Sequence, residues 1–345
     1  MRVLQSIGDF LDIGVPNDSR DNRIALIPAD VKKLVDAGHS VFIEKNAGVS
    51  ADFSDEEYEK AGAKITDSPW KHEMVISVKS HADSPFEENQ IYMAYLHIEK
   101  GQSPELLEKL LEKKITAYAF EEIRNEKGRR LVNLGYEAGV VGMYEGLRTY
   151  GKILEENGGE NEFEKLPVIR KTGKDKAYEF LSNLNLKEKP EVVIMGYGNV
   201  YRGANEVLEK TGIKLLVLTE KETSHMERYL PSLDILVNAV VWLPGQPHLV
   251  TREMLKLMKK TALIVDISCD RNGAVETCIP TDWKNPTYKE EGITHFCVDK
   301  LPNAISRESS THLSSMIIGH VLKVANGEEL KTGLMTKNGE FVYRK

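Results

Sequence analysis

The stretch that decides the fold is Glu191-Val-Val-Ile-Met-Gly-Tyr-Gly-Asn-Val-Tyr-Arg-Gly-Ala204. An apolar run rich in β-branched residues leads into two glycines and then into a helical pattern. Gly196 allows a sharp turn, and Gly198 lets the backbone approach phosphate oxygens closely. The free N–H groups and the dipole at the start of the helix attract a pyrophosphate. Such a glycine pair also occurs in ordinary strand–helix turns, but a second strand expected at 214–218 favours a dinucleotide site.

Four further positions concern the cofactor. Asn199 and Val200 open the helix, so their N–H groups are expected to face the phosphates. After the next strand, Glu220 lies where an acidic side chain binds the ribose hydroxyls of NAD. A carboxylate there repels the additional phosphate of NADP, whereas Lys221 beside it has the opposite effect. The sequence therefore favours NAD and leaves NADP open.

Composition limits the classes of protein and partner. The chain has 345 residues, of which 41% are hydrophobic and 29% charged, as expected for a globular protein of two domains. Its formal net charge is −7 and it has no long basic block, which argues against nucleic acid or an anionic membrane surface as a partner. No apolar run approaches the roughly 18 residues that span a bilayer. Small molecules are therefore the expected partners, and a homo-oligomer is expected.

The N-terminal segment and the cysteines indicate in which compartment the protein works and whether it binds a metal. The segment Met1–Asp9 lacks the apolar core of a secretory signal. Cys269, Cys278 and Cys297 are odd in number and have no metal-type spacing, so no metal site is predicted. The sequence predicts a cytoplasmic protein with reduced thiols.

Alternating strands and helices predict an α/β fold with mostly parallel sheets that are covered on both faces. Before residue 130 the expected strands are 10–15, 40–44, 74–78, 91–96 and 115–120, and the expected helices are 29–37, 54–61 and 104–113. After it, long helices are expected at 138–155 and 309–325, strands at 192–195, 214–218, 235–239, 262–266 and 294–298, and a hairpin at Asn338-Gly339. The first half is expected to be complete by about residue 130.

Two cationic side chains in the first half are candidates for substrate binding. Arg23 lies between a strand and a helix, where a guanidinium can bind a carboxylate through two parallel hydrogen bonds. Lys79 ends the strand Met74–Lys79, at the sheet edge where α/β proteins bind ligands. It can hold a keto acid by an oxygen atom. For both residues, a charge that simply faces water is the alternative.

Two further side chains are candidates for proton transfer. His97 ends the neighbouring strand, and imidazole titrates near neutral pH. A purely structural histidine is the alternative, but its equivalence to Lys79 supports a shared site. Asp270 lies on the loop after the strand at 262–266 and can relay a proton or orient an amine. Asp266 within that strand is expected to be structural.

Several motifs, taken together, resemble the alanine dehydrogenase/pyridine nucleotide transhydrogenase superfamily. They are Ile13-Gly-Val-Pro16, Arg23-Ile-Ala-Leu-Ile-Pro28, Asn238-Ala-Val-Val-Trp-Leu-Pro-Gly245 and Val265-Asp-Ile-Ser-Cys-Asp270 followed by Gly273-Ala-Val-Glu276. Within the superfamily, the sequence of the turn at 196–204 is most similar to the corresponding turn of N5-(carboxyethyl)ornithine synthase and of the saccharopine-forming lysine-ketoglutarate reductases. One departure is that Tyr201 replaces the usual third glycine, with Gly203 following it.

The resemblance implies roles and a domain plan. Arg23 and Lys79 would bind substrate, His97 would be the acid/base group, and Asp270 would be an active-site residue. Ala239 and Val240 would lie beside the nicotinamide. The substrate domain would be discontinuous, residues 1–133 plus 306–345, around a Rossmann-like nucleotide domain at 134–305. Both domains would be doubly wound, with a cleft between them.

The predicted reaction is an NAD(P)H-dependent reductive condensation of an amino acid's amine with a 2-keto acid such as pyruvate. If the amine donor is basic, Glu276 is a candidate to face it. One alternative is an alanine dehydrogenase, in which ammonia replaces the amino acid. The other is a non-catalytic nucleotide-binding module of the transhydrogenase type, which the joint presence of Lys79, His97 and Asp270 disfavours.

Overall fold

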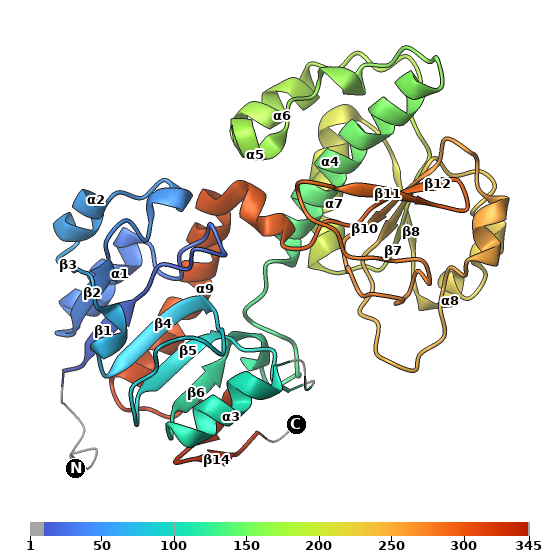
Figure 1. Ribbon diagram of the computed structural model, residues 1–345. Helices are drawn as coiled ribbons and strands as arrows, with labels where there is room; N and C mark the ends of the chain where they lie inside the picture. The colour runs from blue at the N-terminus through green and yellow to red at the C-terminus, as the bar shows by residue number, and fades with distance from the viewer. Residues whose placement is uncertain (1–9, 100, 102, 344–345) are drawn as a thin grey trace. The chain divides into compact units, whose positions relative to one another are not determined.

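The computed structural model in Figure 1 describes residues 10–99, 101 and 103–343. The chain forms two compact units, which are considered separately. The first unit is Met1–Asn133 with Ser306–Lys345, and the second is Leu134–Ile305. In the described part of the chain, no helix is both long and apolar enough to cross a membrane.

The first unit is built on an eight-stranded sheet of order β14-β13-β6-β5-β4-β1-β2-β3. Its strands are β1 (Asp12–Val15), β2 (Ser40–Glu44), β3 (Lys64–Thr66), β4 (Met74–Lys79), β5 (Ile91–Tyr95), β6 (Thr116–Ala119), β13 (Leu334–Lys337) and β14 (Glu340–Phe341). All pair in parallel except β13 and β14, which are antiparallel. The expectation that this half is complete by residue 130 is wrong, because β13 hydrogen-bonds to β6 and covers an otherwise open edge.

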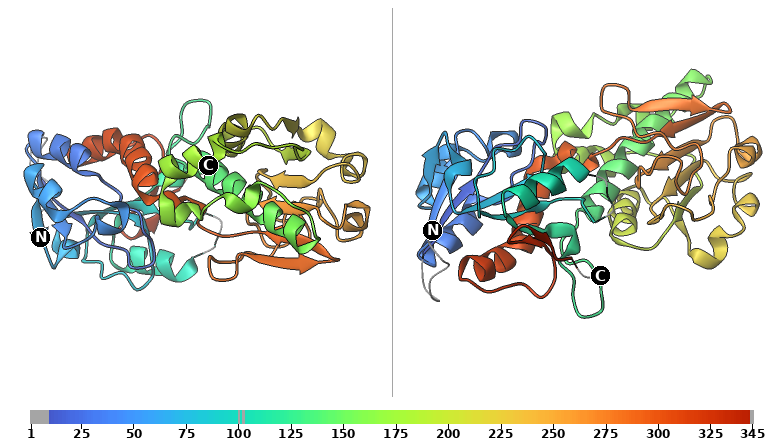
Figure 2. Two further views of the ribbon diagram at one scale, coloured as in Figure 1. Left: turned by 90° about the horizontal axis from the view of Figure 1, so that it is seen from above. Right: turned by 60° about the horizontal axis from the view of Figure 1, so that its bottom comes forward.

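The helices of the first unit are α1 (Pro28–Asp36), α2 (Asp55–Lys60), α3 (Pro104–Glu112) and α9 (Ser306–Ala325), with 3₁₀ helices η1 (Val49–Ala51), η2 (Pro69–Lys71) and η3 (Phe120–Glu122). In both views of Figure 2, α9 in red lies beside the blue N-terminal segments. Two serines of α9 accept backbone hydrogen bonds from the Arg23 segment: Ser310 Oγ from the Ile24 N–H (3.0 Å) and Ser314 Oγ from the Ile27 N–H (3.1 Å). The C-terminal helix therefore fixes the loop that carries Arg23.

The second unit has a six-stranded sheet of order β11-β12-β10-β9-β7-β8. Its strands are β7 (Val192–Met195), β8 (Leu215–Leu218), β9 (Ile235–Asn238), β10 (Leu263–Asp266), β11 (Thr287–Glu290) and β12 (Ile293–Phe296). Only β11 is antiparallel. Strands β7, β9, β10 and β12 are fully buried, as expected of a covered parallel sheet. β7 is wholly apolar, β9 and β10 are apolar up to their last residue, and β12 carries the buried polar residues Thr294 and His295.

The helices of the second unit are α4 (Gly135–Glu156), α5 (Ile169–Thr172), α6 (Lys174–Ser182), α7 (Asn199–Thr211) and α8 (Glu220–Thr223), with 3₁₀ helices η4 (Phe163–Lys165), η5 (Met226–Arg228), η6 (Glu253–Leu257) and η7 (Leu301–Ile305). Helices α4 and α7 pack in close contact through glycines. A Cβ at Gly203 would lie 2.0 Å from the carbonyl oxygen of Tyr136, and one at Gly139 would lie 2.0 Å from that of Val200. The glycine that follows Tyr201 thus serves close helix packing.

The predicted fold class, α/β with two doubly wound, mostly parallel sheets, is confirmed. Several elements lacked a sequence signal. Strand β11 alternates exposed and half-buried residues at the sheet edge, and β3 has only three residues with no buried side chain. The helices α5 and α6 are short and carry many charges. The long helices begin earlier than expected, at Gly135 and Ser306.

Candidate functional site

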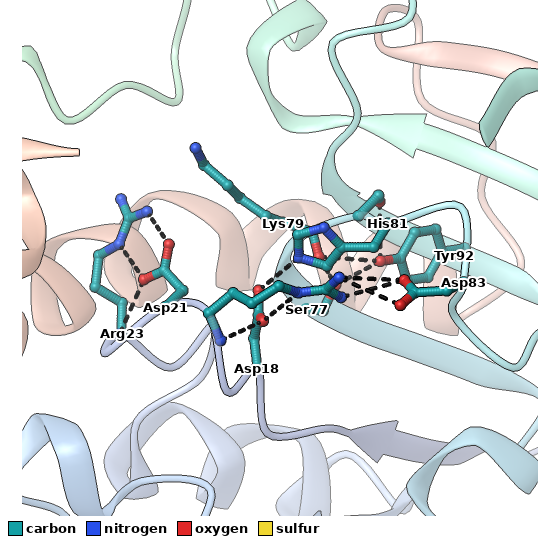
Figure 3. A network of polar contacts seen from close by, with 10 residues as sticks. Asp18, Asp21, Arg23, Ser77, Lys79, His81, Asp83 and Tyr92 are labelled. Carbon is teal, nitrogen blue, oxygen red and sulfur yellow. Dashed lines mark hydrogen bonds and ion pairs between the residues drawn. The ribbon is translucent and has the colours of Figure 1, made fainter. Parts of the chain in front are cut away.

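Arg23 is held by a neighbouring carboxylate (Figure 3). Its Nε donates to Asp21 Oδ1 (2.8 Å) and its Nη2 donates to Asp21 Oδ2 (2.5 Å), and both residues are about 95% buried. Burial opposes the charge on Asp21, but the hydrogen bonds and charge of Arg23 outweigh it, so the pKa of Asp21 lies below its ordinary value. Burial also opposes the charge on Arg23 and by itself would lower its pKa, but the hydrogen bond and charge of Asp21 raise the pKa of Arg23 above its ordinary value. Arg23 is therefore a fixed, charged guanidinium and not a solvated loop residue.

Lys79 lies at the carboxyl end of β4. Figure 3 shows its side chain extending toward the same side as the Arg23 guanidinium. The charge of Lys79 contributes to the lowered pKa of Asp21, which places the lysine within electrostatic reach of that carboxylate. The strand end is fixed by Ser77, whose hydroxyl donates to the Lys79 carbonyl (2.9 Å) and contacts the Tyr92 hydroxyl (2.5 Å).

A second polar group flanks these cations and lacked a sequence signal of its own. Asp18 Oδ2 lies 2.9 Å from His81 Nε2 (Figure 3). Arg20 donates to Asp83 at 3.3 Å. These contacts tie the loop after β1, which carries Arg23, to the loop that begins directly after Lys79 at the end of β4.

His97 follows β5 and adopts a left-handed backbone, with φ of 53°. Its ring stacks on Tyr95, with ring centroids 6.0 Å apart, and its side chain is 45% exposed. Tyr95 also raises the pKa of Arg23 electrostatically, so Tyr95 lies within range of both the arginine and the histidine. Lys79 and His97 thus lie at the carboxyl ends of the adjacent strands β4 and β5, and the Arg23–Asp21 pair lies within electrostatic range of Lys79 and Tyr95.

Glu121 is a further residue that the sequence analysis missed. It accepts hydrogen bonds from the backbone N–H groups of Leu96 (3.1 Å) and His97 (2.5 Å), and its Oε1 lies 3.7 Å from His97 Nδ1. Burial raises the pKa of Glu121 to about 7, against the effect of these hydrogen bonds. It therefore holds His97 in its unusual backbone conformation. The only available signal was that Glu121 follows β6, the strand next to β5.

The turn after β7 forms the other candidate site. Gly196 has a φ of 107°, and a Cβ there would lie 2.8 Å from the carbonyl oxygen of Ala239. Gly198 precedes α7 without a side-chain cap, and a Cβ there would meet nothing within 4 Å. Asn199 and Val200, both half-buried, form the first turn of α7. This turn leaves room above a helix N-terminus, the arrangement that binds phosphate groups.

The remaining cofactor candidates lie on the neighbouring strands of the second sheet. Glu220 and Lys221 follow β8, and both are exposed at the start of α8. Ala239 and Val240 follow β9, and Ser268 Oγ donates to the Val240 carbonyl at 2.7 Å. These residues and the glycine turn thus lie at the carboxyl ends of β7, β8 and β9, which are adjacent.

Two predicted site residues lie beyond β10. Asp270 is half-buried on the loop that follows the strand. Glu276 Oε2 accepts a hydrogen bond from the backbone N–H of Arg252 at 2.7 Å, so one oxygen of its carboxylate is already hydrogen-bonded within the protein. Asp266, expected to be structural, is 1% exposed, and burial raises its pKa to about 6.

Comparison with known proteins adds to this geometry. Residues 14–141 match the family described as alanine dehydrogenase/PNT, N-terminal domain, and residues 190–343 match its C-terminal domain. Alanine dehydrogenase 1 of Staphylococcus aureus strain Mu50 is 31% identical over 344 residues, covering 93% of this chain and 91% of that protein. The chain belongs to the alanine dehydrogenase/PNT family.

Solved structures of this family agree with the fold. An L-alanine dehydrogenase superposes with a TM-score of 0.77 at 26% identity, covering 96% of this chain and 97% of the other. A transhydrogenase from Sinorhizobium meliloti has a TM-score of 0.71 at 19% identity, covering 96% and 99% of the two chains, a likeness of fold alone. The predicted superfamily and an NAD(P)-dependent oxidoreductase of the CH–NH class are confirmed at the level of the family.

The second unit fits the nicotinamide dinucleotide of this family. A Cβ at Gly198 would meet nothing within 4 Å and α7 begins without a side-chain cap, features that suit the binding of a pyrophosphate.

Proposed function

We propose that this protein is an alanine dehydrogenase that uses NAD. The reaction converts alanine, NAD⁺ and water to pyruvate, ammonium, NADH and a proton. The observation that carries the proposal is that Lys79 and His97 end adjacent strands at one sheet edge, in a member of this family. The buried Arg23–Asp21 pair lies within electrostatic range of Lys79 and of Tyr95, on which His97 stacks. Two fixed cations suit a small 2-keto acid, which presents a carboxylate and a carbonyl oxygen to them.

Each of the three candidate side chains of the first unit has a proposed role in the reaction. Asp21 occupies the Nε–Nη2 edge of Arg23, and none of the described residues hydrogen-bonds to Nη1, which we assign to the substrate carboxylate. Lys79 polarises the carbonyl oxygen. His97 moves the proton when ammonia adds to the carbonyl carbon and when water leaves. Substrate recognition is thus assigned to side-chain charge.

The second unit is proposed to hold the coenzyme. When bound, the nicotinamide supplies or accepts the hydride at the substrate carbon. The N–H groups of Asn199 and Val200 would hold the pyrophosphate, and Ala239 and Val240 would border the ring. Glu220 would bind the ribose hydroxyls and favour NAD, against the opposing charge of Lys221. Asp270 would orient the amine.

A second candidate is the reductive condensation of an amino acid's amine with the keto acid. It is favoured by the amino-acid sequence of the turn Gly196–Ala204, which resembles that of N5-(carboxyethyl)ornithine synthase. Against it, Glu276, the carboxylate proposed to face a basic amine, accepts a hydrogen bond from the backbone of Arg252. Ammonia needs no such partner, so we place alanine dehydrogenase first.

One assay separates the two candidates. NADH and NADPH consumption is measured with pyruvate plus ammonium, with pyruvate plus ornithine or lysine, and with pyruvate alone, and products are identified by mass spectrometry. Alanine formed only with ammonium supports the proposal. A secondary amine product formed with ornithine or lysine, and no alanine, would overturn it in favour of the condensation.

A further inference from the structure

All three cysteines of the chain meet beside a buried carboxylate in the second unit. Cys297 Sγ lies 3.1 Å from Cys269 Sγ and 3.3 Å from Cys278 Sγ. Ligand atoms of Asp266, Cys278 and Cys297 all lie within 4.8 Å of one another. Cys269 follows β10 by three residues and Cys297 follows β12 directly, so the fold joins positions far apart in sequence.

The carboxylate of Asp266 is oriented by its neighbours. Oδ1 accepts hydrogen bonds from Asn238 Nδ2 and from the Cys269 N–H, both at 3.0 Å. Oδ2 is fully buried and accepts no hydrogen bond of normal geometry from any of the described residues, and the Cys278 thiol lies beside the carboxylate. A buried carboxylate oxygen without a partner is costly, and it points to a ligand. The two donors to Oδ1 would act as the outer shell of that ligand site.

We propose that Cys269, Cys278, Cys297 and Asp266 form a binding site for one thiophilic divalent cation of the Zn²⁺ class. Three sulfurs and one carboxylate oxygen make a tetrahedral set of the kind that zinc prefers. With Zn–S distances of about 2.3 Å, neighbouring sulfurs in such a site lie about 3.8 Å apart. The Cys297–Cys269 and Cys297–Cys278 pairs, at 3.1 and 3.3 Å, would therefore open by about 0.5 to 0.7 Å. Cys269 lies outside the group of ligand atoms that are mutually within 4.8 Å, so its loop would also move toward Cys278 and Asp266 to complete the set.

The site has a structural character. With Cys269 included, the protein would fill all four coordination positions; Cys278 and Cys297 are fully buried, Asp266 is 1% exposed and Cys269 is half-buried. Catalytic zinc sites keep an open position, whereas closed sites stabilise folds. The ion would join β10, β12 and the segment that carries Cys278. Because Cys269 immediately precedes Asp270, it would also fix the loop that carries this proposed active-site residue.

The first experiment measures metal content. The full-length protein is purified without an affinity tag or metal column, dialysed, and analysed by inductively coupled plasma mass spectrometry. About one equivalent of zinc per chain is expected. Cobalt supplied to chelator-treated protein should give the intense visible bands of tetrahedral thiolate-bound Co²⁺. If cobalt produces no such bands and no metal copurifies, the proposal fails; so it does if intact-mass analysis shows a disulfide among the three cysteines.

The second experiment uses matched variants. Cys278→Ser and Asp266→Asn should each lower the bound metal at least tenfold. Ser268→Ala removes a hydrogen bond from the same loop (Ser268 Oγ to the Val240 carbonyl) and should keep one equivalent. Equal metal in all three variants would overturn the proposed ligand set. Neither experiment measures turnover, so their outcome is independent of the proposed reaction.

Discussion

The two sheet edges that carry candidate residues differ in how they meet a ligand. In the first unit the edge presents the charged side chains of Arg23, which Asp21 holds in a buried ion pair, and of Lys79, whose backbone carbonyl accepts a hydrogen bond from Ser77. In the second unit it presents backbone, because Gly196 and Gly198 carry no side chain and α7 begins without a side-chain cap. The comparison shows that the same kind of sheet edge can suit two different ligands. Charged side chains suit a small anion, whereas glycines, which expose the backbone, suit a pyrophosphate.

The largest effect is expected at His97. Its backbone is left-handed, a conformation that asparagine tolerates well, so His97→Asn removes the imidazole with little strain. If His97 moves the proton, kcat should fall about a hundredfold or more. Steady-state kinetics measure this, with His225→Asn, an exposed histidine of the second unit, as the control. Unchanged kcat in His97→Asn would remove the histidine from the mechanism.

The next effect concerns the buried carboxylate beside His97. The pKa of Glu121 is raised from 4.5 to about 7 by burial, so the native state binds the proton more tightly than the unfolded chain does. Its contribution to the free energy of unfolding is therefore full below pH 4.5 and is lost as the pH rises through about 7. Glu121→Gln should flatten this dependence by on the order of 2 kcal/mol.

Denaturant unfolding across that pH window measures the Glu121 effect. Glu108→Gln, at an exposed position of α3, is the matched control and should leave the dependence as in wild type. The same slope in Glu121→Gln and wild type would show that burial of this carboxylate is not what makes the first unit sensitive to pH.

The backbone site of the second unit is tested at Gly198. A Cβ at Gly198 would have no other protein atom within 4 Å, so the Gly198→Ala variant should fold normally. It should nevertheless weaken NADH binding about tenfold, because the methyl group enters the space proposed for phosphate. Fluorescence titration measures the affinity. Gly319→Ala on α9, whose Cβ is equally free of contacts, should bind normally; if both variants bind as wild type does, the turn is not the phosphate site.

The smallest effect is expected in cofactor choice. Glu220→Arg exchanges an exposed carboxylate for a cation at the end of β8 and should shift the ratio of kcat/KM values toward NADPH by about tenfold. Glu209→Arg, at an exposed position of α7, changes the net charge equally and should leave the ratio alone. The same shift in both variants would mean that overall charge, and not a contact at Glu220, sets the preference.

Local patterns predicted much of this fold. Strands β2 and β7 have the predicted bounds, since Ser40–Glu44 and Val192–Met195 are bounded by clear turn signals. Edge elements were missed because their side chains are half exposed and carry little periodicity, as in β11. Residues at strand ends, such as Lys79 and His97, were predictable because carboxyl ends of parallel strands share one edge. Glu121 was not, because its role depends on a contact with the backbone of another strand.

The sequence by itself determined the α/β class, the glycine turn and the cationic strand ends, because each depends on residues close together in the chain. Only the tertiary structure decided that Asp21 holds Arg23 in a buried ion pair, and that α9 fixes its loop. It alone brought Cys269, Cys278 and Cys297 into contact beside Asp266. The physical reason is that burial and long-range contacts are properties of the packed chain, and sequence spacing does not encode them.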